Sequence, residues 1–365
     1  MSKVYWHGRH PTFPGYSSPL GKLHKQGIQH LRSLGWHEVP VNEEAFIPAF
    51  AWTTKKAADF PSTGENLPLV RPLPQTCTQV VDDKHLLARL VAGHSGLQRS
   101  SPATRTDLSG LLDELVQNDD SGASSIAQQR WFVKHRHGVK GTAVQVMQTA
   151  TLRSWLETRL ATASAGSDFV VQREVAPPAI WEGRKFAVRC HALVAARGHS
   201  PPAAWLHRDV LVLPHAVVYD PSSDEPAVHI SQSGKHHPPP VLATEVPPAH
   251  PAAQTSLWPR LRCLVGHCLS AAHGSLIPST RCEVSTLYSL LACDVALRDD
   301  GTPYLLEVNS HCAIADGTMS AVDADVYTRL VADVASLIVL PAVEAGTDPC
   351  PGGFEPLEDA FSAFP

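Results

Sequence analysis

The sequence lacks the features that mark several large classes of protein. Its eight cysteines, in a chain of 365 residues, form no C-x-x-C pair and no spacing typical of a zinc site. Lys3 is not followed by the apolar segment of a signal peptide, and no apolar run reaches the ~18 residues that a membrane span needs. We therefore expect a cytoplasmic protein, in a reducing compartment, with no membrane partner.

Charge is also scarce and unevenly distributed. Asp, Glu, Lys and Arg make up 18% of the chain, and the net charge is −5. Residues 1–60 have a balance of +3, whereas residues 341–365 have a balance of −5. A nucleic-acid-binding domain needs a strongly basic surface, so we expect no nucleic-acid partner. The 43% of hydrophobic residues suffices for two or three folded domains.

Two common signatures of nucleotide-binding enzymes are missing. The Walker A pattern G-x-x-x-x-G-K-[ST] is absent. His207-Arg208-Asp209 matches the catalytic-loop tripeptide of protein kinases, but the position five residues later is Pro214 rather than asparagine, and no D-F-G follows. The sequence therefore predicts neither a P-loop enzyme nor a protein kinase.

The hydrophobic pattern predicts an α/β fold of the mixed, α+β kind. Asp82 and Asp83 precede an apolar stripe of helical spacing and are expected to cap that helix. The expected strands are 3–6, 131–133, 169–171, 186–194 and part of 284–297, and the expected helices are 20–34, 86–91, 108–116, 152–160, 257–269 and 322–338.

Some local details are also expected. Thr149 or Thr151 is expected to cap the fourth of these helices, and Pro259 is expected in the first turn of the fifth. Residues 198–255 are rich in proline and are expected to be irregular. Residues 342–365 are expected to form a loosely held acidic tail.

The segment 304–309 combines an apolar strand with two polar side chains. Because side chains alternate along a strand, Glu307 and Asn309 project to the same side. A turn at 299–301 predicts a β-hairpin that brings Asp294 of the preceding strand close to both. Three oxygen-bearing side chains so placed suit Mg²⁺. The alternative is a strand end with solvated polar residues.

A glycine-containing loop between two strands presents two lysines. Lys134 lies at the end of an apolar strand, and Lys140 precedes Gly141 in the loop. Glycines allow backbone N–H groups to approach anionic oxygens, and the two cations could neutralise neighbouring phosphates. The alternatives are an ordinary basic hairpin, or a metal pair formed by His135 and His137 with a third ligand unidentified.

A second segment pairs extended backbone with cations. Gln172-Arg173-Glu174-Val175 follows a core strand, and its N–H and C=O groups could pair with the edge of an adenine. Lys185 and Arg189 lie at even spacing on the next strand, with Ala187 between them, and therefore share a face. They suit a phosphate and a ribose; the alternative is a cationic, exposed strand face.

Taken in order, these motifs resemble the tubulin–tyrosine ligase family, a branch of the ATP-grasp fold. The resemblance extends from about Lys84 to about Ile338 and is fragmentary between 195 and 280. The matching segments are WFVKHRHGVKG, VVQREV followed by GRKFAVR, HISQ at 229–232, and LLACDVALRDDGTPYLLEVNS. The last is the most specific, because it joins an aspartate-bearing strand, a turn and LLEVN.

The resemblance implies an ATP-grasp architecture with the nucleotide held between two domains. It implies domains at 1–75 (small N-terminal α/β), 76–174 (central ATP-grasp), 175–341 (C-terminal ATP-grasp with the metal site) and 342–365 (acidic tail). It implies ATP contacts from Lys134, Lys140, Gly141, Gln172, Arg173, Glu174, Val175, Lys185 and Arg189. It implies Mg²⁺ ligation by Asp294, Glu307 and Asn309, and catalytic roles for Lys134, Lys185, Arg189 and Glu307.

The implied reaction is amide-bond formation through an acyl-phosphate. The expected substrates are ATP, an amino acid and a protein or peptide acceptor, with the acidic tail of tubulin as one candidate, and the expected state is a monomer. The chain departs from the family pattern at Ala187, where K-F-D-x-R has an acid, at Leu213, where an arginine is usual, and at Gln232, where H-L-T-N ends in asparagine. These departures leave two alternatives open, namely a weak or inactive scaffold and a ligase for small molecules.

Overall fold

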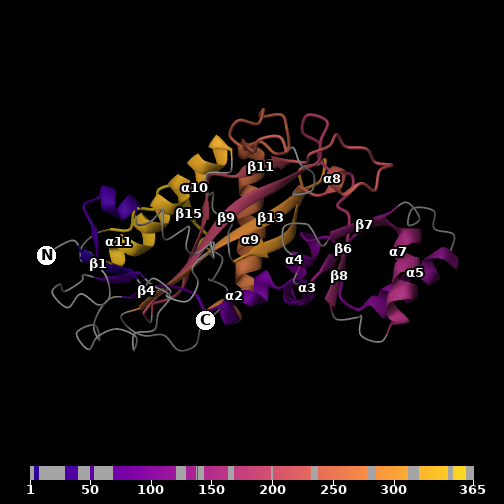
Figure 1. Ribbon diagram of the computed structural model, residues 1–365, viewed down its shortest axis with the longest axis horizontal. Helices are drawn as coiled ribbons and strands as arrows, with labels where there is room; N and C mark the ends of the chain where they lie inside the picture. The colour runs from indigo at the N-terminus through magenta and orange to yellow at the C-terminus, as the bar shows by residue number, and fades with distance from the viewer. Residues whose placement is uncertain are drawn as a thin grey trace.

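The computed structural model describes residues 4–7, 29–39, 50–52, 69–120, 129–136, 138, 144–162, 168–198, 200–231, 237–277, 285–310, 320–343 and 348–358. These residues form two separate β-sheets with helices packed on and between them, which confirms the expected mixed α+β class (Figure 1). Among the described helices, none combines the length and the hydropathy that crossing a membrane requires.

The large sheet contains strands from both ends of the chain. The central path runs β12-β11-β9-β13-β4-β3-β1-β2, with β10 on β9, β15 on β10 and β14 on β13. Its strands are β1 (Val4–His7), β2 (His37–Val39), β3 (Phe50–Trp52), β4 (Leu69–Pro72), β9 (Phe186–Arg197), β10 (Ala203–His207), β11 (Leu211–Pro214), β12 (Val241–Leu242), β13 (Ser285–Leu297), β14 (Pro303–Asn309) and β15 (Phe354–Pro356). The domain boundaries expected from the sequence stay predictions.

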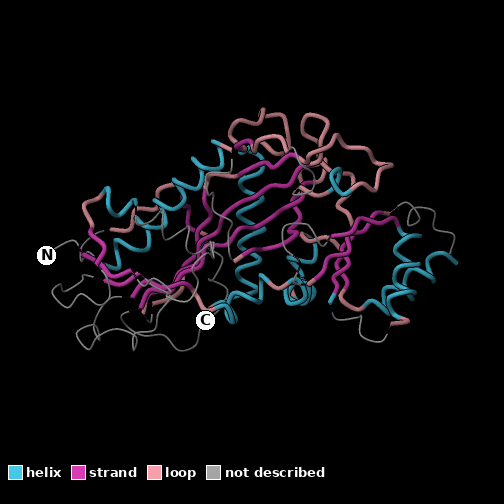
Figure 2. The backbone as a smooth tube through the Cα atoms, in the orientation of Figure 1, coloured by secondary structure: helices cyan, strands magenta, loops and turns pink. Residues whose placement is uncertain are grey.

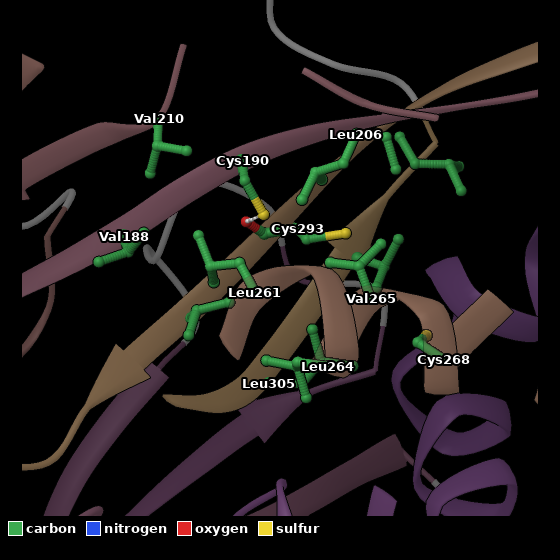
Figure 3. Packing of buried hydrophobic residues seen from close by; sticks show 14 of the residues in the cluster. Val188, Cys190, Leu206, Val210, Leu261, Leu264, Val265, Cys268, Cys293 and Leu305 are labelled. Atoms are coloured by element: carbon green, nitrogen blue, oxygen red, sulfur yellow. Dashed lines mark hydrogen bonds between the residues drawn. The ribbon is translucent and has the colours of Figure 1, made fainter. Parts of the chain in front are cut away.

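The long strands β9 and β13 form the centre of this sheet because both are apolar on two faces. One face packs on α9 (Gln254–Leu276), whose Leu261, Leu264 and Val265 lie against Cys190 and Cys293 (Figure 3). The other face packs on α10 (Ala321–Val334) and on the π-helical turn and α11 that continue it (Ala335–Val339 and Leu340–Val343). Burial on both sides explains why these strands read as nearly continuous hydrophobic runs.

The small sheet has the order β5-β8-β6-β7. Its strands are β5 (Thr104–Arg105), β6 (Arg130–His135), β7 (Val144–Gln148) and β8 (Phe169–Arg173). Trp131, Val133 and Val171 pack on α5 (Leu108–Asp120) and α7 (Thr149–Leu160). Because side chains alternate, the intervening residues of β6 and β8 project from the opposite face, which is turned toward the large sheet.

Short helices lie between the two sheets (Figure 2). They are α2 (Gln75–Asp82), α3 (Lys84–Gly93) and α4 (Ser95–Arg99), and a further short helix, α8 (Pro226–His229), follows β11. Asp83 accepts hydrogen bonds from the backbone N–H groups of His85 and Leu86, which confirms it as the cap of α3. Arg136, which directly follows β6 of the small sheet, donates to the same carboxylate at 2.7 Å, so the cap also ties α3 to that sheet.

Two local expectations about helix starts are wrong. The N-cap of α7 is Gln148, with no side-chain cap, and Thr149 instead accepts from the Trp131 indole and donates to the Gln129 carbonyl. α9 begins at Gln254, so Pro259 lies beyond its first turn. A proline there removes one backbone hydrogen bond, which burial of the helix against β9 and β13 offsets.

Two segments are more regular than expected. Residues 198–255 contain β10, β11, β12 and α8. The C-terminal segment is not loosely held throughout, because β15 pairs with β10 and Phe354 is buried. Glu355 accepts from both Trp258 and Arg262, so the acidic charge of this strand is neutralised against α9.

Candidate functional site

Three charged side chains form a row across neighbouring strands of the large sheet. Arg189 of β9 is directly opposite Asp294 of β13, and Asp294 is directly opposite Glu307 of β14. The pairing of β13 with β14 confirms the predicted hairpin. Its register shifts between Asp294 and Val295, and irregularities of this kind redirect side chains.

Arg189 and Asp294 form a buried, two-pronged ion pair. Nε of Arg189 lies 2.8 Å from Oδ1 of Asp294, and Nη2 lies 2.9 Å from Oδ2. Burial alone would lower the pKa of Arg189, but Asp294 and a hydrogen bond with Tyr327 of α10 raise it well above its ordinary value. Burial raises the pKa of the Asp294 carboxyl; Arg189 opposes this rise, and the nearby Glu307 adds to it.

Glu307 is the carboxylate of the pair that holds its negative charge more strongly. Burial alone would raise its pKa, but the charges of Lys134 and Lys84 and a hydrogen bond from Asn309 bring it below the usual value. Nδ2 of Asn309 lies 3.4 Å from Oε1 of Glu307. Asp294 and Glu307 interact closely and their pKa values shift in opposite directions. The two carboxyl groups therefore titrate as a coupled pair.

Lys134 faces this acid pair from the small sheet. Its Nζ donates to Oε1 of Gln172 at 2.7 Å, and Nε2 of Gln172 donates to Oγ1 of Thr104 at 3.1 Å. Burial lowers the pKa of Lys134, and the charge of Glu307 opposes that effect. The seam between the sheets therefore has acids on one side and a half-buried ammonium on the other.

A small cavity lies in this seam. Its volume is about 20 Å³, room for roughly one water molecule. Its walls come from α3, from β5 and the segment before it, and from β6, β8 and β14. The lining residues are Lys84, Leu87, Ala88, Val91, Ser101, Thr104, Lys134, Val170, Gln172, Leu305 and Leu306. Pockets that enclose small-molecule ligands measure roughly 300–1,000 Å³, so this cavity by itself is too small to enclose a nucleotide.

A second buried charge cluster joins the two sheets. Oε1 of Glu174 lies 2.7 Å from Nζ of Lys185, and Oε2 lies 3.1 Å from Nη1 of Arg130. Arg130 also contacts Asp224 at 3.2 Å and donates to the Pro221 carbonyl at 2.8 Å. Glu174 and Arg130 come from the small-sheet side, whereas Lys185 precedes β9 of the large sheet, and less than a tenth of each side chain is exposed.

His229 completes this cluster. Its Nε2 lies 2.6 Å from the Ser223 carbonyl, which can only accept, so Nε2 carries the hydrogen. Nδ1 lies 3.3 Å from Nζ of Lys185 and 3.6 Å from Oε1 of Glu174. Nζ of Lys185 thus has Glu174 and His229 as close polar neighbours.

Protonation of Glu174 at low pH is expected to destabilise the folded protein. Burial opposes ionisation, but hydrogen bonding from His229 and the charges of Lys185 and Arg130 lower the pKa of Glu174 from 4.5 to about 2. Since the folded pKa is the lower one, the stabilisation is complete above pH 4.5 and is lost as pH falls toward 2. Such a shift corresponds to about 3 kcal/mol of unfolding free energy.

Urea unfolding measured at several pH values tests this expectation. Glu174→Gln should be about 3 kcal/mol less stable than the parent near neutral pH, and the difference should shrink below pH 4. Glu114→Gln, which removes an exposed ion pair with Arg105, is the matched control and should change stability by less than about 1 kcal/mol. A constant difference between Glu174→Gln and the parent at all pH values would contradict the assignment.

The donor chemistry at the acid pair fits magnesium. Asp294, Glu307 and Asn309 supply oxygen ligands only, and hard cations such as Mg²⁺ prefer oxygen. Within the part of the chain that the structure describes, no group of three His, Cys, Asp or Glu side chains is placed to hold a metal. A site with two acids and one amide therefore needs further oxygens from a phosphate or water, as magnesium sites commonly do.

The structure brings together most of the residues that the sequence singled out. Lys134, Arg189, Asp294, Glu307 and Asn309 converge on the seam. Lys185 lies instead in the second cluster with Glu174. The predictions for Lys140, Gly141, His137 and Gln232 fall outside the described residues.

The segment expected to face an adenine is partly occupied by the chain itself. The N–H of Arg173 donates to the Ala103 carbonyl at 2.8 Å, and that of Glu174 donates to the Arg130 carbonyl at 2.9 Å. The side chains of Gln172 and Glu174 are bonded to Lys134 and Lys185. A ligand would thus meet this segment mainly at its end, at Val175.

Three residues of these clusters were not identified from the sequence. Lys84 opens α3, donates to the Gly138 carbonyl at 2.9 Å and lies near Glu307; its position beside the Asp83 cap was the available signal. Arg130 precedes an apolar strand and carried no signal. Tyr327 was read only as part of a helix, although it contacts Arg189.

Comparison with known proteins identifies a family for part of the chain. The model of the tubulin-tyrosine ligase family matches residues 77–233. This region includes the small sheet, most of α2, all of α3 and the segments that carry Lys134, Lys185 and Arg189. No curated protein sequence matches the chain.

Proposed function

The chain carries a domain of the tubulin–tyrosine ligase family, and from this premise we propose that it is an ATP- and Mg²⁺-dependent carboxylate–amine ligase of ATP-grasp architecture. One observation supports the proposal above the others. The acid pair Asp294–Glu307 on the large sheet faces the half-buried Lys134 of the small sheet. A divalent cation beside a lysine is what the phosphates of a nucleotide require.

In the proposed reaction, a substrate carboxylate attacks the γ-phosphorus of ATP, and the bond to ADP breaks. An amine then attacks the resulting acyl-phosphate, phosphate leaves, and the nitrogen loses a proton. Mg²⁺, when bound, would offset the charge gathered on the phosphate oxygens. Asp294, Glu307 and Asn309 would hold it, Lys134 and Arg189 would neutralise the phosphates, and no protein nucleophile is required.

The proposal includes a movement of the two sheets. The seam cavity of about 20 Å³ is too small for a nucleotide, and Arg189 holds both carboxylate oxygens of Asp294. We propose that nucleotide entry separates the sheets and that Arg189 then exchanges Asp294 for phosphate oxygens. Closure around ligands is common in enzymes that must exclude water.

The substrate is proposed to differ from that of typical family members. Ala187 and Leu213, the two strand positions that depart from the family pattern, are directly opposite each other on β9 and β11. An acid and an arginine have thus been replaced by a neighbouring apolar pair, next to Arg189. The acceptor proposed is a protein or peptide, and an acidic tail such as that of tubulin remains a candidate.

The same apolar pair supports a second function from a different class. A domain that kept the fold but lost charges beside Arg189 could act as a scaffold without turnover. ADP release measured across a panel of amino acids and peptide acceptors separates the two. Release that depends on one amino acid supports the ligase, and nucleotide binding without any such release supports the scaffold. A small-molecule acceptor that replaces the peptides would identify the third alternative.

Lysine substitutions in the seam are expected to weaken nucleotide binding. Lys134→Met should raise the dissociation constant of Mg·ATP by about ten- to a hundredfold, because a charge-assisted hydrogen bond is worth about 1.5–3 kcal/mol. Lys84→Met should act in the same direction. Arg153→Gln, which removes an exposed cation on α7, is the control for total charge. Calorimetry that gave the same affinity for all four proteins would contradict the location of the phosphates.

A further inference from the structure

Among the residues that the structure describes, Lys185 has no carboxylate partner on its own strand face. The next residue along that face is Ala187 of β9, and the residue opposite Ala187 on β11 is Leu213. Lys185 is nevertheless buried, with 9% of its side chain exposed. A buried ammonium without a counter-charge tends to lose its proton, so the charge of Lys185 must be supported from another element.

That support comes from the small sheet. Glu174, just beyond β8, places Oε1 at 2.7 Å from Nζ of Lys185. Its second oxygen is held by Arg130 at 3.1 Å, and Arg130 is itself fixed by Asp224 and the Pro221 carbonyl. Each oxygen of the Glu174 carboxylate therefore has its own cationic partner, which fixes the carboxylate beside Nζ of Lys185.

We infer that Glu174 is a positioning residue which keeps Lys185 charged and in place for the nucleotide, in the role that an acid at position 187 would otherwise fill. The inference rests on the proposed function and on the family resemblance, which implies that Lys185 contacts the nucleotide. It explains how a chain with alanine at 187 can retain a working cation at 185. Arg130 serves by fixing the carboxylate that holds the lysine.

The other groups around Lys185 do not replace Glu174. Phe132 and Tyr219 place their ring centres 5.6 and 5.7 Å from Nζ, which stabilises a cation only modestly. His229 contributes a ring nitrogen 3.3 Å from Nζ and no carboxylate. Burial and the positive charge of Arg130 lower the pKa of Lys185, whereas the negative charge of Glu174 raises it. The backbone N–H of His215 donates to the Lys185 carbonyl. Burial lowers the pKa of the His215 ring to about 3, so this ring is neutral.

The test is the pH dependence of affinity for Mg·ATPγS, a slowly hydrolysed analogue, measured by calorimetry between pH 6.5 and 9.5 (roughly the window in which a desolvated lysine loses its proton). In the parent protein the affinity should change by less than about threefold. In Glu174→Gln the loss of the opposite charge should lower the pKa of Lys185. Affinity should then fall at least about tenfold between pH 7 and 9.

Two further variants separate positioning from general stability. Arg130→Met breaks the same buried cluster but leaves Glu174 beside Lys185, so it should reduce stability and keep the flat pH profile. Glu174→Gln combined with Ala187→Asp returns an acid to the lysine from its own strand face and should restore the flat profile. A purely structural role for Glu174 would instead make Arg130→Met and Glu174→Gln behave alike.

The outcomes are distinguishable. A flat profile in Glu174→Gln overturns the inference while leaving the proposed function in place. Absence of Mg·ATPγS binding by the parent protein overturns the proposed function and the inference with it. If Glu174→Gln does not fold, two double variants are compared instead. One combines Glu174→Gln with Ala187→Asp, and the other combines Glu174→Gln with Ala187→Asn. A flat profile in the aspartate variant alone is expected, and equal behaviour of the two overturns the inference.

Discussion

Replacing Glu307 by glutamine is expected to lower the rate of ATP-dependent amide formation by about a hundred- to a thousandfold, the range seen when one electrostatic contact to a transition state is removed. Glu307 is the acid that neighbouring lysines keep ionised, so glutamine removes the charge that would hold Mg²⁺ against the phosphates. The folded state should tolerate the change, because the amide keeps the shape of the side chain. ADP release in the presence of a productive substrate pair measures the loss.

The matched control lies in the same hairpin. Asp299→Asn removes an exposed acid from the turn between β13 and β14 and should leave the rate within about twofold of the parent, as expected for an exposed charge. Full activity in Glu307→Gln would contradict the metal assignment. Equal losses in both variants would indicate that the hairpin, rather than the acid, had been disturbed.

Arg189→Met is expected to cost about 3–5 kcal/mol of unfolding free energy, since it leaves Asp294 as a buried acid without its counter-ion. The pKa of Asp294 is already raised by burial, and it should rise further without Arg189. A group whose folded pKa lies above its unfolded value stabilises the fold at low pH and loses that contribution as pH rises. The cost should therefore be smaller near pH 4 than near pH 8.

A double variant provides the control for this prediction. Arg189→Met with Asp294→Asn removes both charges and should recover a large part of the lost stability, because no unpaired charge stays buried. Arg329→Met, which breaks an exposed pair with Asp209, should cost less than about 1 kcal/mol. Additive effects in the Arg189/Asp294 double variant, measured by urea unfolding, would contradict the direct coupling of the two residues.

The sequence was sufficient for features that depend on local pattern. The hairpin that joins Asp294 to Glu307 follows from two apolar runs and a glycine-containing turn, and the structure confirms it. The Asp83 cap and the helix it begins follow from one acid before an apolar stripe, and they are also confirmed. These features are encoded within a dozen or so neighbouring residues, so no long-range contact is needed to predict them.

The rest depended on contacts between distant segments. Arg130 and Glu174 are adjacent only because β6 and β8 pair, and Lys185 joins them from the other sheet. Nothing in the spacing of Arg130 indicates that partnership. For the same reason the C-terminal segment was expected to be loose, although β15 pairs with β10, which is about 150 residues away in the chain. Strand pairing at such separations leaves no periodic trace in the sequence.

The central claim is that the seam between the two sheets binds Mg²⁺ and ATP, and a crystal structure with Mg²⁺ and a non-hydrolysable ATP analogue tests it most directly. The account predicts a metal ion in contact with Asp294, Glu307 and Asn309, and the β- and γ-phosphates beside Lys134. It also predicts that Arg189 has left Asp294 for the phosphates. Nucleotide bound elsewhere, or a metal held by other residues at saturating concentrations, would contradict the account.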